Sequence, residues 1–242
     1  LKGECDPTIS VGGILPAIGG NIRVGQSETF LTEACEYTNS FLSFFPTLGI
    51  ILNMDADHLD FFKDIDDIRH SFRKFAELLP ADGALIINAD TPKYEMVAEN
   101  LPCKVITYGL EHDAEYSASD ITYDEFGHPT FHVLHNGADI GICSLKVPGI
   151  HNVSNALASI AAGRLLGLDN EVIFAGLKDF GGTDRRFQYK GKVGEVTIID
   201  DYAHHPTEIE ATLHAAHNYP HKKIWCVFQP HTYTRTKALL PE

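Results

Sequence analysis

Apolar residues in the first half of the chain follow two different spacings. The run LGIILNM (48–54) is almost continuously apolar, which predicts a strand buried on both faces of a parallel sheet. Between Ile65 and Leu79 the apolar positions recur at helical spacing, which predicts an amphipathic helix. The run GALIINAD (83–90) predicts another buried strand. This strand–helix–strand order is typical of an α/β fold with a mostly parallel central sheet flanked by helices.

Other periodicities surround this core. Residues 6–25 contain Gly-Gly pairs and prolines among short apolar runs, which predicts strands and tight turns. Residues 119–147 alternate between apolar and polar and carry Phe-Gly and Asn-Gly turn signals, so we expect a small antiparallel meander of about three strands. Helical spacing returns from residue 153 to residue 165, with Gly167 as the expected C-cap, and a second helix is expected over 171–177.

The segment GGTDRRF (181–187) predicts a linker. The α/β pattern then restarts with a strand at EVTIID (195–200), a helix over 207–217 and a strand at KIWCVF (223–228). Thr207 and Glu210 have the spacing of a capping box. We therefore place a boundary near Asp184, with one domain over 1–184 and the beginning of a second over 185–242.

Composition narrows the class of protein. Of 242 residues, 44% are hydrophobic and 21% are charged, which is ordinary for a globular chain. Nineteen basic against 33 acidic residues give a net charge of −14, so a nucleic-acid partner is not expected. No membrane segment or signal peptide is visible. The five cysteines form no CxxC pair and are interpreted as reduced thiols of a cytoplasmic protein. The chain begins at Leu1, and we expect it to be a piece of a longer protein.

Polar side chains that could bind a metal follow the first buried strand. In NMDADHLDFF, Asp55, Asp57 and His58 come directly after it, and in parallel sheets ligands bind at the carboxyl ends of strands. The predicted strand TFLTEA brings Glu33 toward the same edge as His58, and Glu36 follows. Carboxylates and an imidazole there suit a divalent cation such as Mg²⁺. The alternatives are a polar loop that caps the next helix and a surface glutamate.

Two further stretches suit a nucleotide. In GIHNVSNALASIAAG, His151, Asn152 and Asn155 gather at a predicted helix start, where they could read a purine edge or hold a phosphate. Asn152 could instead simply be the N-cap. In TDRRF, the adjacent Arg185 and Arg186 suit a phosphate clamp, although either could pair with surface carboxylates in so acidic a chain.

The most unusual stretch is IIDDYAHHPTEIE (198–210), which lies between a predicted strand and a predicted helix. Its aspartates can accept hydrogen bonds from ribose hydroxyls, and its tyrosine and histidines can donate to an anionic substrate. These residues are Asp200, Asp201, Tyr202, His204 and His205.

FQPHTYTRT (228–236) follows the next predicted strand and places His231, Tyr233 and Arg235 at what should be the same sheet edge. His205 and Tyr233 could each be merely structural. No G-x-x-x-x-G-K-[ST] phosphate loop occurs anywhere in the chain, so an ATP-dependent function requires that loop upstream of Leu1.

Together these stretches resemble the Mur ligases of peptidoglycan synthesis, and most of all the branch that adds L-alanine to UDP-N-acetylmuramic acid. The resemblance spans nearly the whole chain, in the order GGILPAIGGN, EACEYTNSFL, LNMDADHLDFF, GIHNVSNALASIAA, DRRF, DDYAHHPTEIEATL and FQPHTYTRT. It implies most of a central ATP-binding domain without its phosphate loop, followed by the start of a C-terminal Rossmann-like domain. It also implies an ATP- and Mg²⁺-dependent ligase that forms an acyl phosphate and then an amide.

The resemblance also implies roles for single residues. Glu33 and His58 would hold Mg²⁺, Arg186 would touch the ATP phosphates and Asp201 the ribose. The adenine would meet the trio His151, Asn152 and Asn155. The muramyl substrate or the incoming amino acid would face Tyr202, His204, His231 and Arg235. Of all these residues, His204, Arg186 and Glu33 would act in catalysis.

Three departures from the family pattern leave alternatives open. Thr232 stands where the family often has arginine, EACEYT replaces a more acidic stretch, so that the role of Glu36 is open, and Lys63 matches a lysine whose carbamylation this branch does not require. A ligase that reattaches recycled muropeptides is one alternative, and a nucleotide- or metal-binding module without catalysis is another. The oligomeric state is left open, and the chain alone is expected to be inactive.

Overall fold

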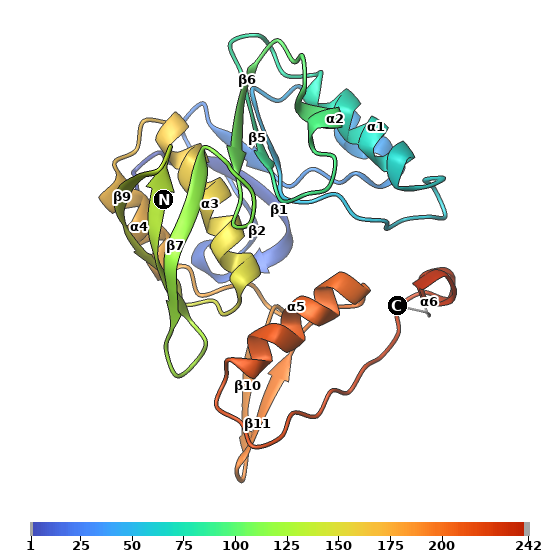
Figure 1. Cartoon of the computed structure of the whole chain (residues 1–242), viewed down its shortest axis with the longest axis vertical. Helices are drawn as coiled ribbons and strands as arrows, with labels where there is room; N and C mark the ends of the chain where they lie inside the picture. The colour runs from blue at the N-terminus through green and yellow to red at the C-terminus, as the bar shows by residue number, and fades with distance from the viewer. Residues whose placement is uncertain (1, 240–242) are drawn as a thin grey trace.

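A six-stranded sheet forms the centre of the computed structural model, which describes residues 2–239 except the side chains at 234, 235 and 238 (Figure 1). Neighbouring strands from β4 to β7 pair parallel, whereas β7, β8 and β9 pair antiparallel. The predicted meander is therefore a continuation of the parallel sheet, and the predicted fold class is confirmed. The strands are β4 Leu48–Ile51, β5 Ala84–Asn88, β6 Lys104–Tyr108, β7 Tyr116–Tyr123, β8 Pro129–His135 and β9 Ala138–Ser144.

Helices cover both faces of this sheet. Ile86 of β5 lies in one core cluster with α3 (Ile150–Leu165), while its neighbours Leu85 and Ile87 lie in another with α1 (Ile65–Ala76). Because successive side chains of a strand point to opposite faces, β5 must be apolar throughout, as its sequence predicted. The short helix α2 (Glu95–Ala98) lies beside α1, and α4 (Asn170–Asp179) packs on β9 and α3.

The two ends of α3 differ in how well the sequence predicted them. Asn152 is not the N-cap: the helix begins at Ile150, because Gly149 adopts a φ of 97° that favours glycine and turns the chain earlier. At the other end the C-cap is Leu166, one residue before the predicted Gly167, which follows it as the left-handed residue that ends the helix. Gly167, with φ 76°, donates its amide to the carbonyl of Arg164 (3.0 Å), and the next amide donates to that of Gly163 (3.0 Å), which is a Schellman motif.

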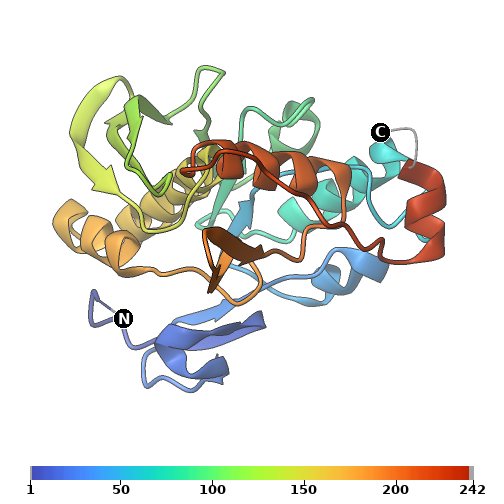
Figure 2. The same ribbon diagram turned by 90° about the horizontal axis from the view of Figure 1, so that it is seen from below.

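A separate three-stranded sheet, in the order β2-β1-β3, precedes the central one (Figure 2). Its strands are β1 Thr8–Leu15, β2 Gly20–Arg23 and β3 Phe30–Thr32, with the 3-10 turn η1 (Pro16–Ile18) between the first two. Strand β3 ends just before Glu33, as predicted, and the 3-10 segment η2 (Tyr37–Ser43) follows.

The C-terminal part begins with an antiparallel hairpin, β10 (Gln188–Val193) and β11 (Val196–Asp200). Helix α5 (Pro206–His217) follows, and α6 (Tyr233–Leu239) lies beyond a long irregular segment (Figure 1). The predicted strand at 223–228 is wrong. Trp225 and Val227 are 78% and 97% exposed, and no described strand pairs with this segment. An apolar run becomes a strand only where a neighbour supplies the ladder hydrogen bonds.

None of the helices in the described residues is long and apolar enough to cross a membrane.

Candidate active site where the two parts meet

The loop after β4 is held in place from the neighbouring strands. Tyr108 of β6 donates its hydroxyl to the carbonyl of Leu52 (3.3 Å), and Asn88 of β5 donates its amide to the same oxygen (3.1 Å). Burial, assisted by the charge of Asp90, raises the pKa of Tyr108, so this hydroxyl keeps its proton. The polar residues that follow therefore start from a fixed point at the carboxyl edge of the sheet.

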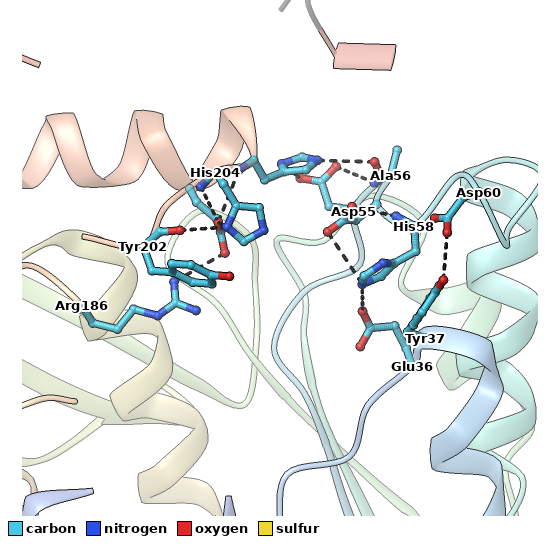
Figure 3. A network of polar contacts seen from close by, with 12 residues as sticks. Glu36, Tyr37, Asp55, Ala56, His58, Asp60, Arg186, Tyr202 and His204 are labelled. Atoms are coloured by element: carbon cyan, nitrogen blue, oxygen red, sulfur yellow. Dashed lines mark hydrogen bonds and ion pairs between the residues drawn. The ribbon is translucent and has the colours of Figure 1, made fainter. Parts of the chain in front are cut away.

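His58 lies at the centre of the first polar cluster (Figure 3). Its Nε2 is 3.3 Å from Oε1 of Glu36 and 3.9 Å from Oδ2 of Asp57, and its ring stacks on Tyr37 with centroids 4.5 Å apart. The hydroxyl of Tyr37 donates to Asp60 (2.8 Å), and this hydrogen bond to a carboxylate raises the pKa of Tyr37. The imidazole of His58 thus lies between two carboxylates, and the stacked ring of Tyr37 fixes its orientation.

Glu33, the other predicted metal ligand, points elsewhere in this structure. Its Oε2 accepts from the amide of Gly12 (2.7 Å), and His58 pairs with Glu36 instead. Within the described part of the chain no group of three or more His, Cys, Asp or Glu side chains is arranged to hold a metal ion. Mg²⁺ usually takes only one or two protein carboxylates and completes its shell with phosphates and water. His58 and its neighbouring carboxylates therefore fit a Mg²⁺ ion whose remaining ligands are phosphate and water oxygens. The role of Glu33 as a metal ligand stays a prediction.

The predicted nucleotide residues come together from both sides of the linker. The amide nitrogen of Asn152 donates to the carbonyl of Pro148 (2.8 Å) and lies 3.2 Å from Nε2 of His151, which must therefore accept. Burial lowers the pKa of His151, the charge of Arg186 lowers it further, and Asp201 opposes the shift. Arg186, which lies in the linker, and Asp201, which follows it, thus both act electrostatically on a side chain at the start of α3.

Asp201 already has a local role. Its two oxygens accept from the amides of Phe187 and Ala203, both at 2.7 Å, so the carboxylate ties the linker to the loop after β11. Each oxygen keeps a second lone pair for a ligand hydroxyl. Asn155, the third predicted adenine contact, is half-buried three residues after Asn152 on the same helix.

Three predicted substrate residues form an aromatic cluster. The ring of His204 lies 5.0 Å from that of Tyr202 and 5.4 Å from that of His231, and the last two are 6.0 Å apart. The guanidinium of Arg185 stacks 4.4 Å above the Tyr202 ring. The structure therefore brings His231 from beyond α5 to the loop that precedes this helix. The side chain of the fourth, Arg235, lies outside the described residues.

The start of α5 differs from the predicted one. Pro206 is the first helical residue, which makes His205 the N-cap, and the capping box forms between His205 and Glu208. The predicted box of Thr207 and Glu210 is wrong, because proline at the first helical position sets the helix start earlier. The hydroxyl of Thr207 is left to bond elsewhere: it donates to Oδ2 of Asp55 (2.6 Å).

Glu208, which the sequence prediction missed, connects several predicted residues. Its Oε2 accepts from the amides of His204 (3.1 Å) and His205 (3.4 Å), and its Oε1 lies 3.5 Å from Nη1 of Arg186. Burial alone would raise the pKa of Glu208, but these amides and the positive charge of Arg186 outweigh it, so the pKa lies below its usual value. A glutamate two residues after Pro206 was the signal that could have revealed it.

A cavity of about 450 Å³ adjoins this junction, which is within the size range of small-molecule sites. It opens between the turn at Phe126 and the linker, and Lys146, Arg186 and Tyr219 are among its lining residues. Of the predicted nucleotide residues only Arg186 lines it.

Comparison with known proteins decides the family. Residues 16–163 match the Mur ligase middle domain, and residues 185–242 match the family described as Mur ligase, glutamate ligase domain. The chain belongs to the Mur ligase family. The two polar clusters of this Mur ligase thus come from two different family regions, His58 and His151 from the first and Tyr202 and His204 from the second.

The relatives of this Mur ligase include ligases with two different names. It is 60% identical over 243 residues to UDP-N-acetylmuramate–L-alanine ligase of Lachnospira eligens, covering 100% of this chain and 53% of that protein. Among solved structures, the UDP-N-acetylmuramate-alanine ligase of Thermotoga maritima matches 88% of this chain and 48% of that one, with TM-score 0.75 and 30% identity. A murein peptide ligase of Psychrobacter arcticus matches 87% of this chain and 48% of its own, with TM-score 0.68 and 25% identity. The chain spans about half the length of the curated relatives it matches.

Proposed function

We propose that this chain belongs to a cytoplasmic, ATP-dependent ligase that adds L-alanine to UDP-N-acetylmuramic acid during peptidoglycan precursor synthesis. Its identity of 60% to a ligase of that name, across the whole chain, is the observation that carries the proposal. Residues 1–184 would be most of the central ATP-binding domain, and residues 185–242 the start of the C-terminal domain. The junction between them would be the active site.

The reaction has two steps. The carboxylate of the muramic acid attacks the γ-phosphate of ATP and gives an acyl phosphate and ADP. The amine of L-alanine then attacks the acyl carbon, forms the amide and releases phosphate. Such chemistry depends mainly on alignment and on charge neutralisation.

Residues from both regions would bind the nucleotide. His151, Asn152 and Asn155 at the start of α3 would contact adenine, and Asp201 the ribose. Arg186 is held 3.5 Å from Glu208 and could bind phosphate oxygens bidentately. Mg²⁺, held by His58 and Glu33 with Glu36 as a further ligand, would supply charge neutralisation on the phosphates.

The aromatic cluster of Tyr202, His204 and His231, together with Arg235, would receive the muramyl substrate and the amino acid. Nδ1 of His204 lies 2.8 Å from the carbonyl of Tyr202, which can only accept, so this nitrogen carries the proton. In the neutral ring Nε2 is then free to accept a proton from the attacking amine.

The test is phosphate release by the full-length enzyme with ATP, UDP-N-acetylmuramic acid and each of L-alanine, glycine, L-serine and a muropeptide tripeptide. Turnover should require the sugar nucleotide and be fastest with L-alanine. His204→Ala should lower kcat by about 10²–10⁴-fold. The control is His214→Ala, because that side chain lies on the helix that follows but is 71% exposed. Preference for the tripeptide would indicate the recycling branch, and full activity of His204→Ala would remove the assigned base.

For the chain alone we propose binding without turnover. Its sequence has no G-x-x-x-x-G-K-[ST] loop, whose backbone amides and lysine hold the phosphates in P-loop enzymes. Calorimetry should therefore detect weak or no binding of Mg-ATP to the 242-residue chain. Tight binding would mean that the residues assigned to adenine and ribose suffice.

A further inference from the structure

Two side-chain hydrogen bonds join the loop after β4 to the start of α5. The hydroxyl of Thr207 donates to Oδ2 of Asp55 (2.6 Å), and Nε2 of His205 lies 3.4 Å from the carbonyl oxygen of Ala56. Nδ1 of His205 is 3.8 Å from the same Asp55 carboxylate. The joined residues are far apart in the chain, with sequence separations of 152 and 149. Figure 3 shows Asp55 and Ala56 on the loop after β4, and His204 on the loop before α5.

Both partners depend on the contact. His205 is only 6% exposed, and a buried polar ring is costly unless it finds hydrogen-bond partners. The capping box of α5 engages the ring from one side, and the carbonyl of Ala56 supplies the partner for Nε2. Thr207 sits in the first turn of α5, where proline and the capping box fix the backbone, so its hydroxyl has a defined direction. On the other side, Asp55 is fixed because its Oδ1 accepts from the amide of Ala56 (2.8 Å).

The contact also lies between the two clusters of the candidate site. Asp55 is three residues before His58, which pairs with Glu36 in the metal-binding candidate. His205 directly follows His204, which belongs to the aromatic substrate cluster. A shift of one loop against the other would therefore change the distance between the two clusters.

We propose that Asp55, Thr207 and His205 form an interdomain latch, which holds the two clusters at the separation needed for reaction. These three are positioning residues: they touch no reacting atom, and they act through His58 and His204. The catalytic part of this inference rests on the proposed function. The conformational part does not, because it concerns only the distance between the two domains.

The test uses Thr207→Val in the full-length enzyme, which removes the hydroxyl and keeps the shape of the side chain. Thr207→Ser keeps the hydroxyl and should restore the latch. Thr122→Val is the matched control, because the Thr122 hydroxyl is also exposed but bonds a backbone carbonyl of its own sheet, that of Thr130 (3.2 Å). Spin labels on p-acetylphenylalanine at Met96 and His214, both exposed, report the interdomain distance by pulsed EPR.

Thr207→Val should broaden the distance distribution toward longer values. It should lower kcat by about two- to tenfold with a smaller change in KM, the effect of losing one partly exposed hydrogen bond. The serine variant and Thr122→Val should match the parent in both measurements. An unchanged distance distribution for Thr207→Val overturns the latch, even if kcat falls, because Thr207 would then act on the substrate directly. If the parent has no ligase activity, the proposed function fails and the distance measurement alone decides the latch.

Discussion

Glu208→Gln is the substitution whose effect the structure predicts in most detail. The carboxylate accepts from two backbone amides at the start of α5 and faces the guanidinium of Arg186 at 3.5 Å. Glutamine keeps the shape and one acceptor oxygen but removes the negative charge. A negative charge in the first helical turn is worth about 0.3–1 kcal/mol. An ion pair with an exposed arginine adds about 0.2–1 kcal/mol.

We therefore expect Glu208→Gln to lower the free energy of unfolding by about 1 kcal/mol near pH 7. The stabilisation by Glu208 should be lost at low pH. The pKa of Glu208 is depressed in the folded state, so its stabilising contribution is complete above the unfolded-state pKa of about 4.3. That contribution is lost as the pH falls through the lower folded-state value. The difference between parent and variant should thus be constant above about pH 5.5 and shrink below about pH 4.3.

Urea unfolding followed by far-UV circular dichroism measures this difference at each pH. Glu210→Gln is the control on the same helix, since its carboxylate is 75% exposed and pairs with the likewise exposed His214 (3.7 Å), and it should change stability by less than about 0.5 kcal/mol. Equal effects of the two glutamine variants would refute the reasoning. So would a difference that grows as the pH falls.

Three further predictions concern α3 and its surroundings. Leu157→Ala should destabilise the chain by about 2–5 kcal/mol in the same urea assay, because the side chain is fully buried, and a loss below about 1 kcal/mol would contradict the packing. Gly149→Ala should cost about 1–3 kcal/mol, because φ is 97° and a Cβ would meet the ring of His151 at 2.6 Å. Gly181→Ala, where nothing lies within 4 Å, should be neutral, and equal effects would contradict the strain. Arg186→Ala should raise the pKa of His151 in an NMR titration, since the arginine charge lowers it, and an unchanged pKa would place the two far apart.

The strands of the central sheet could be predicted because their burial on both faces requires apolar residues throughout. Leu85, Ile86 and Ile87 are all apolar because β5 has helices on both faces, and a short apolar run bounded by turn residues is typical of such a strand. The strand at 223–228 failed for the complementary reason. Its composition is similar, but Val227 finds no neighbouring strand in the described residues, and pairing is not a property of the segment itself.

The candidate site was predicted in its location rather than in its contacts. The rings of His204 and His231 do lie close together, although the strand that was predicted to bring His231 there does not form. Which carboxylate reaches His58 depends instead on local backbone: Thr38 and Asn39 have φ of 55° and 59°, and His58 itself has 55°. Non-glycine residues rarely adopt these values, so the sequence carried no signal for them. Glu36 therefore lies beside His58 where Glu33 was expected.

The starts of α3 and α5 were also decided by local backbone conformation that the sequence pattern did not reveal. Asn152 and Thr207 are residue types that favour N-caps, yet each lies inside its helix and uses its side chain for another bond. A glycine conformation at Gly149 and the ring of Pro206 decided the helix register, and both outweigh capping preference.

The central claim is that the cluster at His58 and the cluster at His204, which come from different family regions, serve one reaction. A double-mutant cycle tests it: kcat/KM of the full-length enzyme is measured for His58→Ala, His204→Ala and the pair. Groups that act as a unit give strongly non-additive losses. The account predicts that the double variant is hardly slower than the more damaged single one. Losses that multiply, as for independent sites, would contradict it.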